Sequence, residues 1–294
     1  MAIDAGQIRL LPGGLGVVAQ NSQPRVLIAQ ISDLHVKPEG VLAYQRVDTA
    51  AALARCVKEL NRFTPRPDLV VISGDLVDKP SKEAYDHLIR LLKPLELPLA
   101  AIPGNHDHRD LMRVALPDRH AFTAGALHSV REVGDVDVVL IDSITPGKNY
   151  GTLDTDTLAW LDEVLGSSAT RPAFLFLHHP PFETGIAHMD VQNLRNGGDL
   201  APILRRHRRA RLVAAGHVHR AVLTAFAGAA ATICPAPNHA VALDLDARLP
   251  PTFTIEPPAF HLHVWRPGED FGSVVTHSVP IGDFDGPHRF SHDH

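Results

Sequence analysis

The sequence is poor in cysteine and contains no long apolar segment. Its two cysteines, Cys56 and Cys234, cannot build a disulfide framework, which favours a reducing, cytoplasmic setting. No apolar run approaches the ~18 residues that a membrane helix needs. Near the N-terminus, no cationic stretch precedes an apolar one. We therefore expect neither a membrane span nor a secretory signal.

Aromatic residues and positive charge are also scarce. Phe, Trp and Tyr together make up 5% of the chain, and the formal net charge is −5. A chain with this charge and no interleaved series of basic and aromatic residues has little with which to neutralise phosphates or stack bases. Nucleic acid is therefore not the expected partner.

Apolar residues and histidine, by contrast, are plentiful. The 294 residues are 45% apolar and 21% charged, which is the composition of a globular chain with a sizeable core. The length fits one large α/β domain with an appendage, or two domains. Histidine occurs 19 times, and it is the commonest metal ligand and a frequent general acid or base. We therefore ask whether these histidines gather at one place in the fold.

Apolar periodicity divides the chain into three parts. Residues 1–25 are rich in glycine and have no clear period, and we interpret them as a leader. From residue 26, short apolar runs alternate with amphipathic stretches, which predicts βαβ units and a largely parallel sheet. After residue 221, strands follow one another without helices, which predicts a second, antiparallel sheet with a Pro-rich connection at 235–258. We expect strands at 26–31, 69–72, 99–102, 126–130, 136–141, 173–177, 212–215, 221–226, 229–234, 260–265 and 273–279, and helices at 45–61, 81–92, 157–165 and 199–207.

Five short polar motifs directly follow five of the predicted strands. Ligands in open α/β sheets bind outside the carboxyl ends of strands, so we expect these motifs to meet in one pocket. Taken singly, each motif has an ordinary explanation as a turn, a helix cap or a packed loop. All five, in this order at successive strand ends, do not fit a set of unrelated turns. The motifs are Asp33-Leu34-His35, Gly74-Asp75, Gly104-Asn105-His106-Asp107, His178-His179 and Gly216-His217-Val218-His219.

The residue types in these motifs fit a site for two metal ions. Asp, His and Asn side chains together suit borderline ions such as Mn, Fe, Co or Zn better than Ca or Mg alone. Two histidines that stand two residues apart on an extended segment point to the same side and can hold one or two ions. Two metals ~3.5–4 Å apart need a shared carboxylate, and they can then clamp a phosphoryl group. Asp75, in the middle of the set, is the natural bridge.

In this order, the five motifs resemble those of the calcineurin-like metallophosphoesterase superfamily. Within it, the class III cyclic-nucleotide phosphodiesterase and glycerophosphodiesterase branch is the most similar, since Ile141-Asp142-Ser143, Met189-Asp190 and residues 257–263 also follow its pattern. The resemblance covers residues 26–285. It implies an α/β fold, a two-sheet αββα sandwich with a small C-terminal β appendage. The catalytic domain would span 26–234, and the segment 235–294 would complete the second sheet as a cap or oligomerisation segment.

The resemblance also implies a role for each motif residue. Two divalent or trivalent transition-metal ions (Fe, Mn, Zn or Co) would be the cofactors. The first metal would be held by Asp33, His35, Asp75 and His219, and the second by Asp75, Asn105, His178 and His217. His106 would serve as general acid or as a donor to the phosphate, with Asp107 orienting it from behind. His179 would support the ligands or pack the loop rather than bind a metal.

This arrangement predicts the hydrolysis of a small phosphodiester. A hydroxide that bridges the two metals would attack phosphorus in line with the leaving oxygen, which His106 would protonate. The motif loops carry little positive charge for a phosphomonoester dianion, because surface roles suit the nearest candidates, Arg109 and Lys37, equally well. Residues 189–197 are expected to form a loop over the site. The expected substrate contacts are Asn105, His106, Tyr44 and Asn196.

Other functions stay open at this stage. The superfamily also includes protein phosphatases, other phosphomonoesterases and nucleases, and the basic run 205–211 could contact nucleic acid, although we interpret it as the solvated end of a helix. A non-catalytic interaction module is disfavoured, because no expected ligand has been lost. The sequence does not choose between 3′,5′-cyclic nucleotides, 2′,3′-cyclic nucleotides and glycerophosphodiesters. Family likeness further predicts a homo-oligomer, a dimer or larger.

Overall fold

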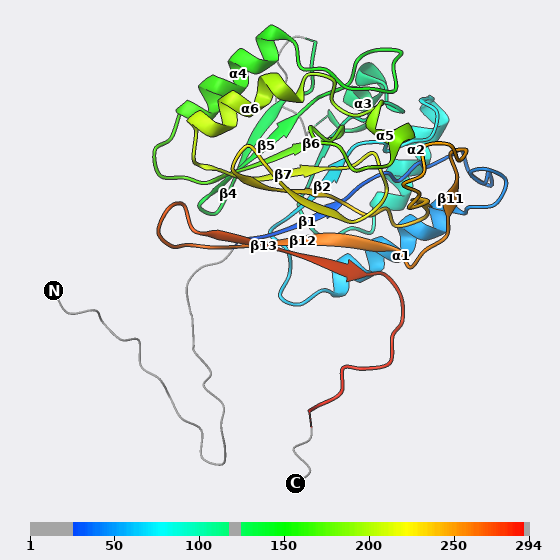
Figure 1. Ribbon diagram of the computed structural model, residues 1–294. Helices are drawn as coiled ribbons and strands as arrows, with labels where there is room; N and C mark the ends of the chain where they lie inside the picture. Colours follow the sequence, from blue (N-terminus) through cyan, green and yellow to red (C-terminus); the bar gives the residue numbers. More distant parts are fainter. Residues whose placement is uncertain (1–25, 118–124, 291–294) are drawn as a thin grey trace, which may run out of the picture.

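Two sheets lie face to face in this protein, and helices cover the outer face of each. The computed structural model describes residues 26–117 and 125–290, and Figure 1 shows the resulting layers in the order helix, sheet, sheet, helix. This is the αββα sandwich that the motifs led us to expect. The interpretation of residues 1–25 as a leader lies outside the described residues.

One sheet has five strands in the order β13-β12-β1-β2-β3. The first three strands of the chain run parallel to one another, whereas β12 is antiparallel to both β1 and β13. The strands are β1 (Val26–Ile31), β2 (Leu69–Ser73), β3 (Leu99–Ile102), β12 (Ala259–Arg266) and β13 (Ser273–Pro280). The helices that follow the parallel strands are α1 (Thr49–Arg62), α2 (Lys82–Leu92) and α3 (Arg109–Ala115).

The other sheet has six strands in the order β4-β5-β6-β7-β9-β8. Its four central strands are parallel, and an antiparallel strand closes each edge. The strands are β4 (Ser129–Val133), β5 (Val136–Ile141), β6 (Ala173–Leu177), β7 (Ala210–Ala215), β8 (Val222–Phe226) and β9 (Ala229–Ile233). The remaining elements are α4 (Thr155–Gly166), α5 (Ala187–Asp190), α6 (Gly197–Arg206) and the two-stranded ribbon of β10 (Ala240–Val241) and β11 (Phe253–Thr254).

Three apolar clusters hold the layers together. On β1, Leu27 and Ile31 pack toward α1 and α2, whereas Ile28 packs between the sheets, as the period of two in a strand requires. Phe174 and Phe176 of β6 meet Ile28 in this central cluster. A third cluster joins β5, β6 and β7 to α4 and α6. Because both faces of the inner strands are covered, those strands are continuous apolar runs in the sequence.

The strands after residue 221 do not form a sheet of their own, so that prediction is wrong. β9 pairs in parallel with β7 and carries β8 at the sheet edge, whereas β12 pairs with β1 in the other sheet. Without β12 and β9, one edge of β1 and one edge of β7 would be unpaired. Pairing with these later strands satisfies the backbone N–H and C=O groups along those edges. The segment beyond residue 234 therefore contributes two strands to one sheet of the sandwich.

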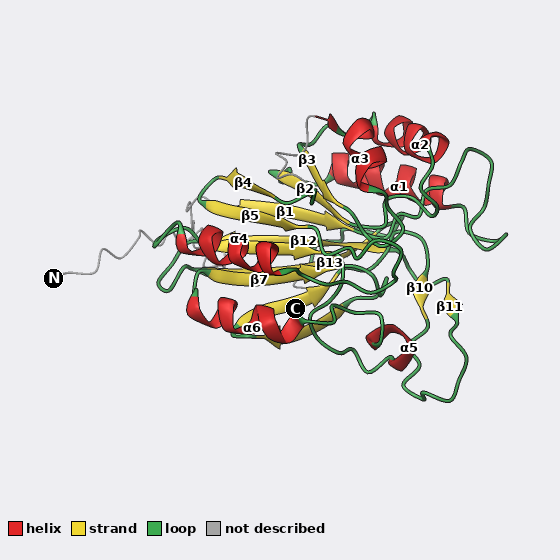
Figure 2. Ribbon diagram, turned by 90° about the horizontal axis from the view of Figure 1, so that it is seen from above, coloured by secondary structure: helices red, strands yellow, loops and turns green. Residues whose placement is uncertain are grey.

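The loops at one end of the sandwich form the region of interest. Because β1, β2 and β3 are parallel, and so are β6, β7 and β9, their carboxyl ends point to this end. Figure 2 shows these loops gathered beside β10, β11 and α5. Among the described residues, the helices are all too short or too polar to span a bilayer.

Candidate metal centre

The loops after β1 and β2 continue the pairing of these strands beyond their ends. The N–H of Asp33 donates to the carbonyl of Gly74 at 3.0 Å, and the N–H of His35 donates to the carbonyl of Asp75 at 3.0 Å. Residues 33–37 and 74–78 therefore lie side by side. This backbone pairing brings the first two motifs together before their side chains make any contact.

Many of the predicted ligands stand in the left-handed backbone region. This region is unfavourable for residues with a side chain, at about 1–2 kcal/mol each, so it persists only where surrounding contacts enforce it. The pairing just described enforces it at the first two loops. The residues are Asp33 (φ 57°), His35 (φ 46°), Asp75 (φ 52°), His217 (φ 74°) and His219 (φ 58°).

The first, second and fifth motifs meet around one buried point. His35 Nε2 lies 3.2 Å from His219 Nε2 and 3.5 Å from Asp75 Oδ2. His219 Nε2 lies 3.4 Å from Asp33 Oδ1. All four side chains are buried, and each offers one atom within reach of a common ion.

The third and fourth motifs meet next to this point, on the other side of the same carboxylate. His178 Nε2 lies 3.4 Å from Asp75 Oδ2, 3.2 Å from Asn105 Oδ1 and 3.3 Å from His217 Nδ1. Asp75 Oδ2 therefore touches both groups of side chains. A Cβ at Gly104 would collide with the carboxylate of Asp75, so only glycine lets the third motif approach so closely.

The hydrogen bonds around the two groups leave imidazole lone pairs facing each other. His178 Nδ1 donates to the carbonyl of Ser73 at 2.9 Å, and His219 Nδ1 donates to the carbonyl of His239 at 3.3 Å. With the proton on Nδ1, the neutral form of each ring has its lone pair on Nε2, which faces Asp75 Oδ2 in His178 and Asp33 Oδ1 in His219, at 3.4 Å in both cases. Lone pairs and carboxylate oxygens gathered at 3–3.5 Å repel one another unless a cation lies between them. The residues therefore fit a dinuclear metal centre, with the N/O donor set of a borderline transition metal.

The electrostatics of the site reflect the shared carboxylate. Burial alone would raise the pKa of Asp75, but His178 and His106 lower it well below its usual range. Burial alone would lower the pKa of His178, but Asp75 raises it to about 9. Burial lowers the pKa of His217 and of His219 well below the usual range. Those two rings are therefore neutral, as a metal ligand must be.

His106 lies beside the first group but is oriented by an unexpected residue. Its ring nitrogen Nδ1 donates to the backbone carbonyl of Asp78 at 2.7 Å, and its backbone N–H donates to Asp75 Oδ1 at 2.9 Å. Asp107 does not orient the ring, which corrects the sequence-based assignment. Its carboxylate instead accepts from the N–H groups of Leu76 and Gly104, at 3.0 and 2.9 Å. Asp107 therefore links the loop after β2 to the loop after β3.

A cavity of about 320 Å³ opens onto the cluster. Its polar wall is formed by the motif side chains, and its apolar wall contains Tyr44 and Phe253, whose rings stack with centroids 4.8 Å apart. The side chains that line it are His35, Tyr44, Asp75, Asn105, His106, Asn149, His188, Met189, Gln192, His217, His219, His239, Val241, Pro251, Thr252 and Phe253. No arginine or lysine occurs among these described lining residues.

Several residues named from the sequence lie elsewhere. The side-chain amide of Asn196 bonds to both backbone groups of Leu153, at 2.7 and 3.0 Å, and does not line the cavity. Arg109 forms a two-pronged ion pair with Asp142. Of the expected loop 189–197, Met189 and Gln192 do reach the cavity. The structure thus brings Tyr44, but not Asn196, to the cavity.

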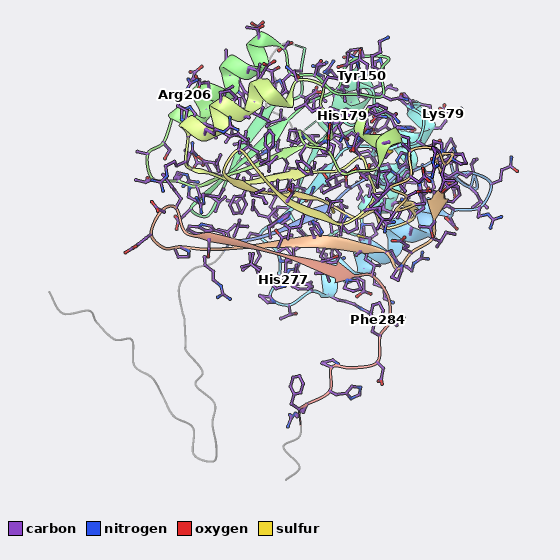
Figure 3. All side chains as sticks on the ribbon, viewed as in Figure 1. Lys79, Tyr150, His179, Arg206, His277 and Phe284 are labelled. Atoms are coloured by element: carbon purple, nitrogen blue, oxygen red, sulfur yellow. The ribbon has the colours of Figure 1, made fainter. Side chains whose placement is uncertain are left out.

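His179 lies among the ligands, as a third member of the group with His178 and His217. Figure 3 labels it inside the upper layer of the molecule. Its Nδ1 lies 2.9 Å from Ser143 Oγ, and burial lowers its pKa well below the usual range. Its ring packs against that of His217, with centroids 4.9 Å apart. The supporting role of His179 stays a prediction, because within the described residues its Nε2 is buried without a hydrogen-bond partner and lies in a group that could hold a metal.

Two further residues of the site escaped sequence reasoning. His239 packs against His219, with ring centroids 4.6 Å apart, and Asp78 faces His35. His239 stands in the loops at the carboxyl end of the sheet because β9 is parallel to β7, whereas we expected an antiparallel strand there. The signal for Asp78 was a second carboxylate three residues after the Gly-Asp motif.

Within the basic run 205–211, Arg205, Arg206 and Arg208 are exposed at the end of α6 and just beyond it, as expected, whereas Arg209 is buried. Arg206 pairs with Asp162, and Arg208 pairs with Asp270 at 3.1 Å. Arg209 is 2% exposed and pairs with Asp137. Charges that are already paired within the chain offer little to a nucleic acid.

Comparison with known proteins agrees with this geometry. A family model described as calcineurin-like phosphoesterase matches residues 26–221. A relative from Arcobacter nitrofigilis, named "Probable glycerophosphodiester phosphodiesterase GpdQ", is 37% identical over 267 residues, which are 90% of this chain and 97% of that protein. The 3′,5′-cyclic adenosine monophosphate phosphodiesterase CpdA of Pseudomonas aeruginosa is 34% identical over 197 residues, covering 66% of this chain and 70% of the relative.

Solved structures share the fold at low sequence identity. A dimetal phosphatase from Danio rerio superposes with a TM-score of 0.60 at 15% identity, covering 87% of this chain and 99% of that one. The likeness concerns the sandwich architecture.

Proposed function

This chain belongs to the calcineurin-like phosphoesterase family, and we propose that it hydrolyses small phosphodiesters at a dinuclear metal centre. Relatives at 34–37% identity are named for glycerophosphodiesters and for cyclic adenosine monophosphate. Both kinds of diester are therefore candidate substrates. Each presents one negative charge on the phosphoryl group and an alkoxide as the leaving group.

One observation carries the proposal. Asp75 Oδ2 lies 3.5 Å from His35 Nε2 and 3.4 Å from His178 Nε2, so a single carboxylate oxygen stands between two converging groups of donors. A bridging carboxylate is what two ions ~3.5–4 Å apart require. We assign one metal to Asp33, His35, Asp75 and His219, and the other to Asp75, Asn105, His178 and His217.

The chain's own residues supply binding and proton transfer. Two such ions, when bound, neutralise charge on the phosphoryl oxygens and lower the pKa of a coordinated water. The carbonyl of Asp78 accepts from Nδ1–H of His106, so Nε2 is the nitrogen left for the substrate, and the cationic ring, with a proton on each nitrogen, can give its Nε2 proton to the departing oxygen. Asn105, His106 and Tyr44 all line the cavity, and they are the proposed substrate contacts.

The cavity wall supports a diester over a monoester. A phosphomonoester carries close to two negative charges at neutral pH, and enzymes commonly meet the second with Arg or Lys. Within the described residues, Arg109 is paired with Asp142 and Lys37 with Asp78, and neither lines the cavity. A singly charged diester needs no such partner.

Three further properties are part of the proposal. The imidazole, amide and carboxylate donors support Fe, Mn, Zn or Co as the ions. Leu243, Leu245 and Ile255 are 62–67% exposed on the segment between β10 and β12, which supports a homo-oligomer, and sedimentation velocity tests this. The free, buried thiols of Cys56 and Cys234 support a cytoplasmic location, which cell fractionation tests.

The proposed activity is tested with a panel of phosphoesters. The protein is stripped with chelator and reloaded with Mn²⁺, Zn²⁺, Co²⁺ or Fe²⁺, and its metal content is measured alongside turnover. Bis(p-nitrophenyl) phosphate, cyclic nucleotides and glycerophosphodiesters are compared with p-nitrophenyl phosphate as the matched monoester. We expect metal-dependent turnover with kcat/KM higher for diesters. A preference for the monoester would favour a phosphatase, and two bound metals without activity on any phosphoester would contradict the proposal.

A further inference from the structure

Two large aromatic side chains stand partly exposed on the apolar wall of the cavity. Tyr44 and Phe253 come from distant parts of the chain, and their rings stack with planes 28° apart. Tyr44 is 56% exposed and Phe253 is 37% exposed, although both line the cavity. Folding usually buries rings of this size, and exposed aromatic surface inside a cavity is typical of a ligand-binding wall.

The backbone holds Tyr44 in a conformation that a residue with a side chain rarely adopts. Tyr44 and Gln45 both lie in the left-handed region, with φ of 50° and 55°. The N–H of Ala43 donates to the carbonyl of Val47 at 2.9 Å, and the N–H of Val47 donates to the carbonyl of Ala43 at 2.8 Å. This closed turn enforces the unfavourable backbone, a feature that is concentrated at functional sites. The turn presents the Tyr44 ring to the cavity instead of the core.

A short ribbon of two strands brings Phe253 to the same wall. Val241 of β10 pairs with Phe253 of β11, and the N–H of Ala242 donates to the carbonyl of Thr252 at 2.9 Å. The ribbon belongs to neither main sheet, and Figure 2 shows it beside the loops at the site end of the sandwich. Val241 and Thr252 also line the cavity. The placement of Phe253 therefore depends on a separate element that is built onto the sandwich.

One imidazole ring separates the aromatic pair from the metal centre. The ring centroid of His239 lies 5.4 Å from that of Phe253 and 4.6 Å from that of His219, a proposed ligand. His239 also meets Tyr44 edge to face, with centroids 5.3 Å apart. A phosphoryl group at the metal centre would therefore place one of its ester arms beside the aromatic pair.

Elsewhere the cavity lining offers hydrogen-bonding groups. Asn149, His188 and Gln192 reach it from the segments that follow β5 and β6. Amide and imidazole groups suit the hydroxyls of a sugar or of glycerol. A pair of stacked rings instead offers a flat apolar face, to which a third ring can be added. The two kinds of surface can therefore distinguish a planar ester arm from a hydroxylated one.

We propose that Phe253, stacked on Tyr44, is a specificity-determining residue that selects phosphodiesters with a planar ring on one ester arm. Every nucleobase has a flat face that stacks on aromatic side chains, whereas a glycerol arm has none. Among the candidate substrates, this favours nucleotide diesters over glycerophosphodiesters. The inference rests on the proposed phosphodiesterase function.

The test compares two substrates that differ only in the base. The full-length, Mn²⁺-loaded protein is assayed with 3′,5′-cyclic adenosine monophosphate and with the 3′,5′-cyclic phosphate of 1-deoxyribose, which has the same phosphodiester but no base. We expect kcat/KM of the unaltered protein to be higher with the base. Phe253→Leu keeps an apolar side chain but removes the flat face, and it is expected to lower this preference about 10-fold, as for the loss of one stacking contact. Phe253→Tyr keeps the ring and is expected to keep the preference.

Phe284 offers a matched control outside the cavity. It is 63% exposed and lies on the segment that follows β13, below the sandwich in Figure 3. Phe284→Leu removes an equally exposed ring and is expected to leave the preference for the base unchanged. The Mn²⁺ content of every variant is measured alongside turnover and is expected to equal that of the unaltered protein.

Three outcomes would overturn the inference. One is an equal preference for the base in Phe253→Leu and in the unaltered protein. Another is an equal loss of kcat/KM for both cyclic phosphates in Phe253→Leu, because the residue would then act on the phosphoryl site or on the fold. The third is a larger loss for glycerophosphocholine than for the cyclic nucleotide, which would assign the wall to a trimethylammonium group.

Failure of the inference and failure of the proposed function give different results with the unaltered protein. Turnover of bis(p-nitrophenyl) phosphate without turnover of the cyclic nucleotide would overturn the inference and leave the proposed function standing. Turnover of no diester by the Mn²⁺-loaded protein would remove the proposed function itself, before any variant is made.

Discussion

Two sets of buried histidines lie in this molecule, and they differ in what their nitrogens meet. At the loop end, His35 and His219 approach each other nitrogen to nitrogen at 3.2 Å, beside two carboxylates. Between the sheets, His263 of β12 meets Thr276 Oγ1 at 2.8 Å and Gln30 Oε1 at 3.0 Å. Its neighbour His261 lies 3.3 Å from Thr232 Oγ1. The loop-end nitrogens face one another and carboxylate oxygens, an arrangement that a cation would stabilise, whereas the β12 nitrogens face neutral hydroxyl and amide groups.

The difference teaches that burial alone does not identify a ligand. Burial lowers the pKa of His263, and likewise of His219, well below the usual range. At His178, by contrast, the charge of Asp75 outweighs burial and raises the pKa to about 9. Histidine count is a weaker guide still, since His277 lies on the outer face of β13, as Figure 3 shows. The partner of each nitrogen is what separates a functional histidine from a structural one.

The strongest way to break the comparison is to remove the carboxylate around which the loop-end set is built. Asp75→Ala is expected to lower metal-dependent turnover by at least about 10³-fold, because the ions supply several kcal/mol of transition-state stabilisation. Turnover of bis(p-nitrophenyl) phosphate and metal content per chain are measured together. Near-normal turnover with metals still bound would contradict the two-metal arrangement.

His106 tests a different role within the same set. His106→Ala is expected to lower turnover by about 10²–10⁴-fold, the range of general acid catalysis, while metal content stays the same. His277→Ala on the exposed face of β13 is the matched control and is expected to change neither quantity. Loss of metal in His106→Ala would make His106 a ligand instead of a proton donor.

Much of the fold could be predicted, because strand existence is a local property. Strands expected at 26–31, 99–102, 136–141 and 173–177 have those bounds, since each is a mainly apolar run that ends at a polar residue or at proline. The helix expected from residue 45 begins at Thr49, because Asp48 caps it by accepting from the N–H of Ala51. Which sheet a strand joins depends on distant partners, so the placement of β9 and β12 could not be derived from their own residues.

The site divides in the same way. Residue type and strand-end position sufficed to name the side chains that meet around Asp75. The role of Asp107 could not be found, because its carboxylate bonds to backbone groups of two loops whose approach is a property of the whole fold. Asp78 was missed for the same reason, since its carbonyl reaches His106 only after the loops pair. The residues with chemical roles could be recognised from short motifs, whereas the residues that support them are defined by contacts between distant segments.

A pair of identical substitutions sharpens the comparison further. His263→Leu is expected to destabilise the metal-free protein by about 1–3 kcal/mol, because Gln30 Oε1 is left buried without its donor. Metal content is expected to stay the same. His219→Leu is expected to do the reverse, with loss of metal and a smaller change in stability, because its Nε2 faces other acceptors. Urea unfolding and metal analysis of both variants measure the crossover, and loss of metal in His263→Leu would erase the distinction between the two sets.

The smallest expected effect is an acid destabilisation that arises from the β12 histidines. Burial lowers the pKa of His261 to about 4 from its ordinary 6.5. Between these values only the unfolded chain takes up the proton, so the stability contributed by the neutral ring is complete above pH 6.5 and is lost as the pH falls toward 4. At pH 5.5 the loss is about 1 kcal/mol relative to pH 7.5. His261→Leu removes the titrating group, so urea unfolding of the two metal-free proteins is expected to converge by that amount between pH 7.5 and 5.5. Parallel stability curves would mean that the ring is protonated in the folded protein, and the β12 set would then need a carboxylate partner like the one at Asp75.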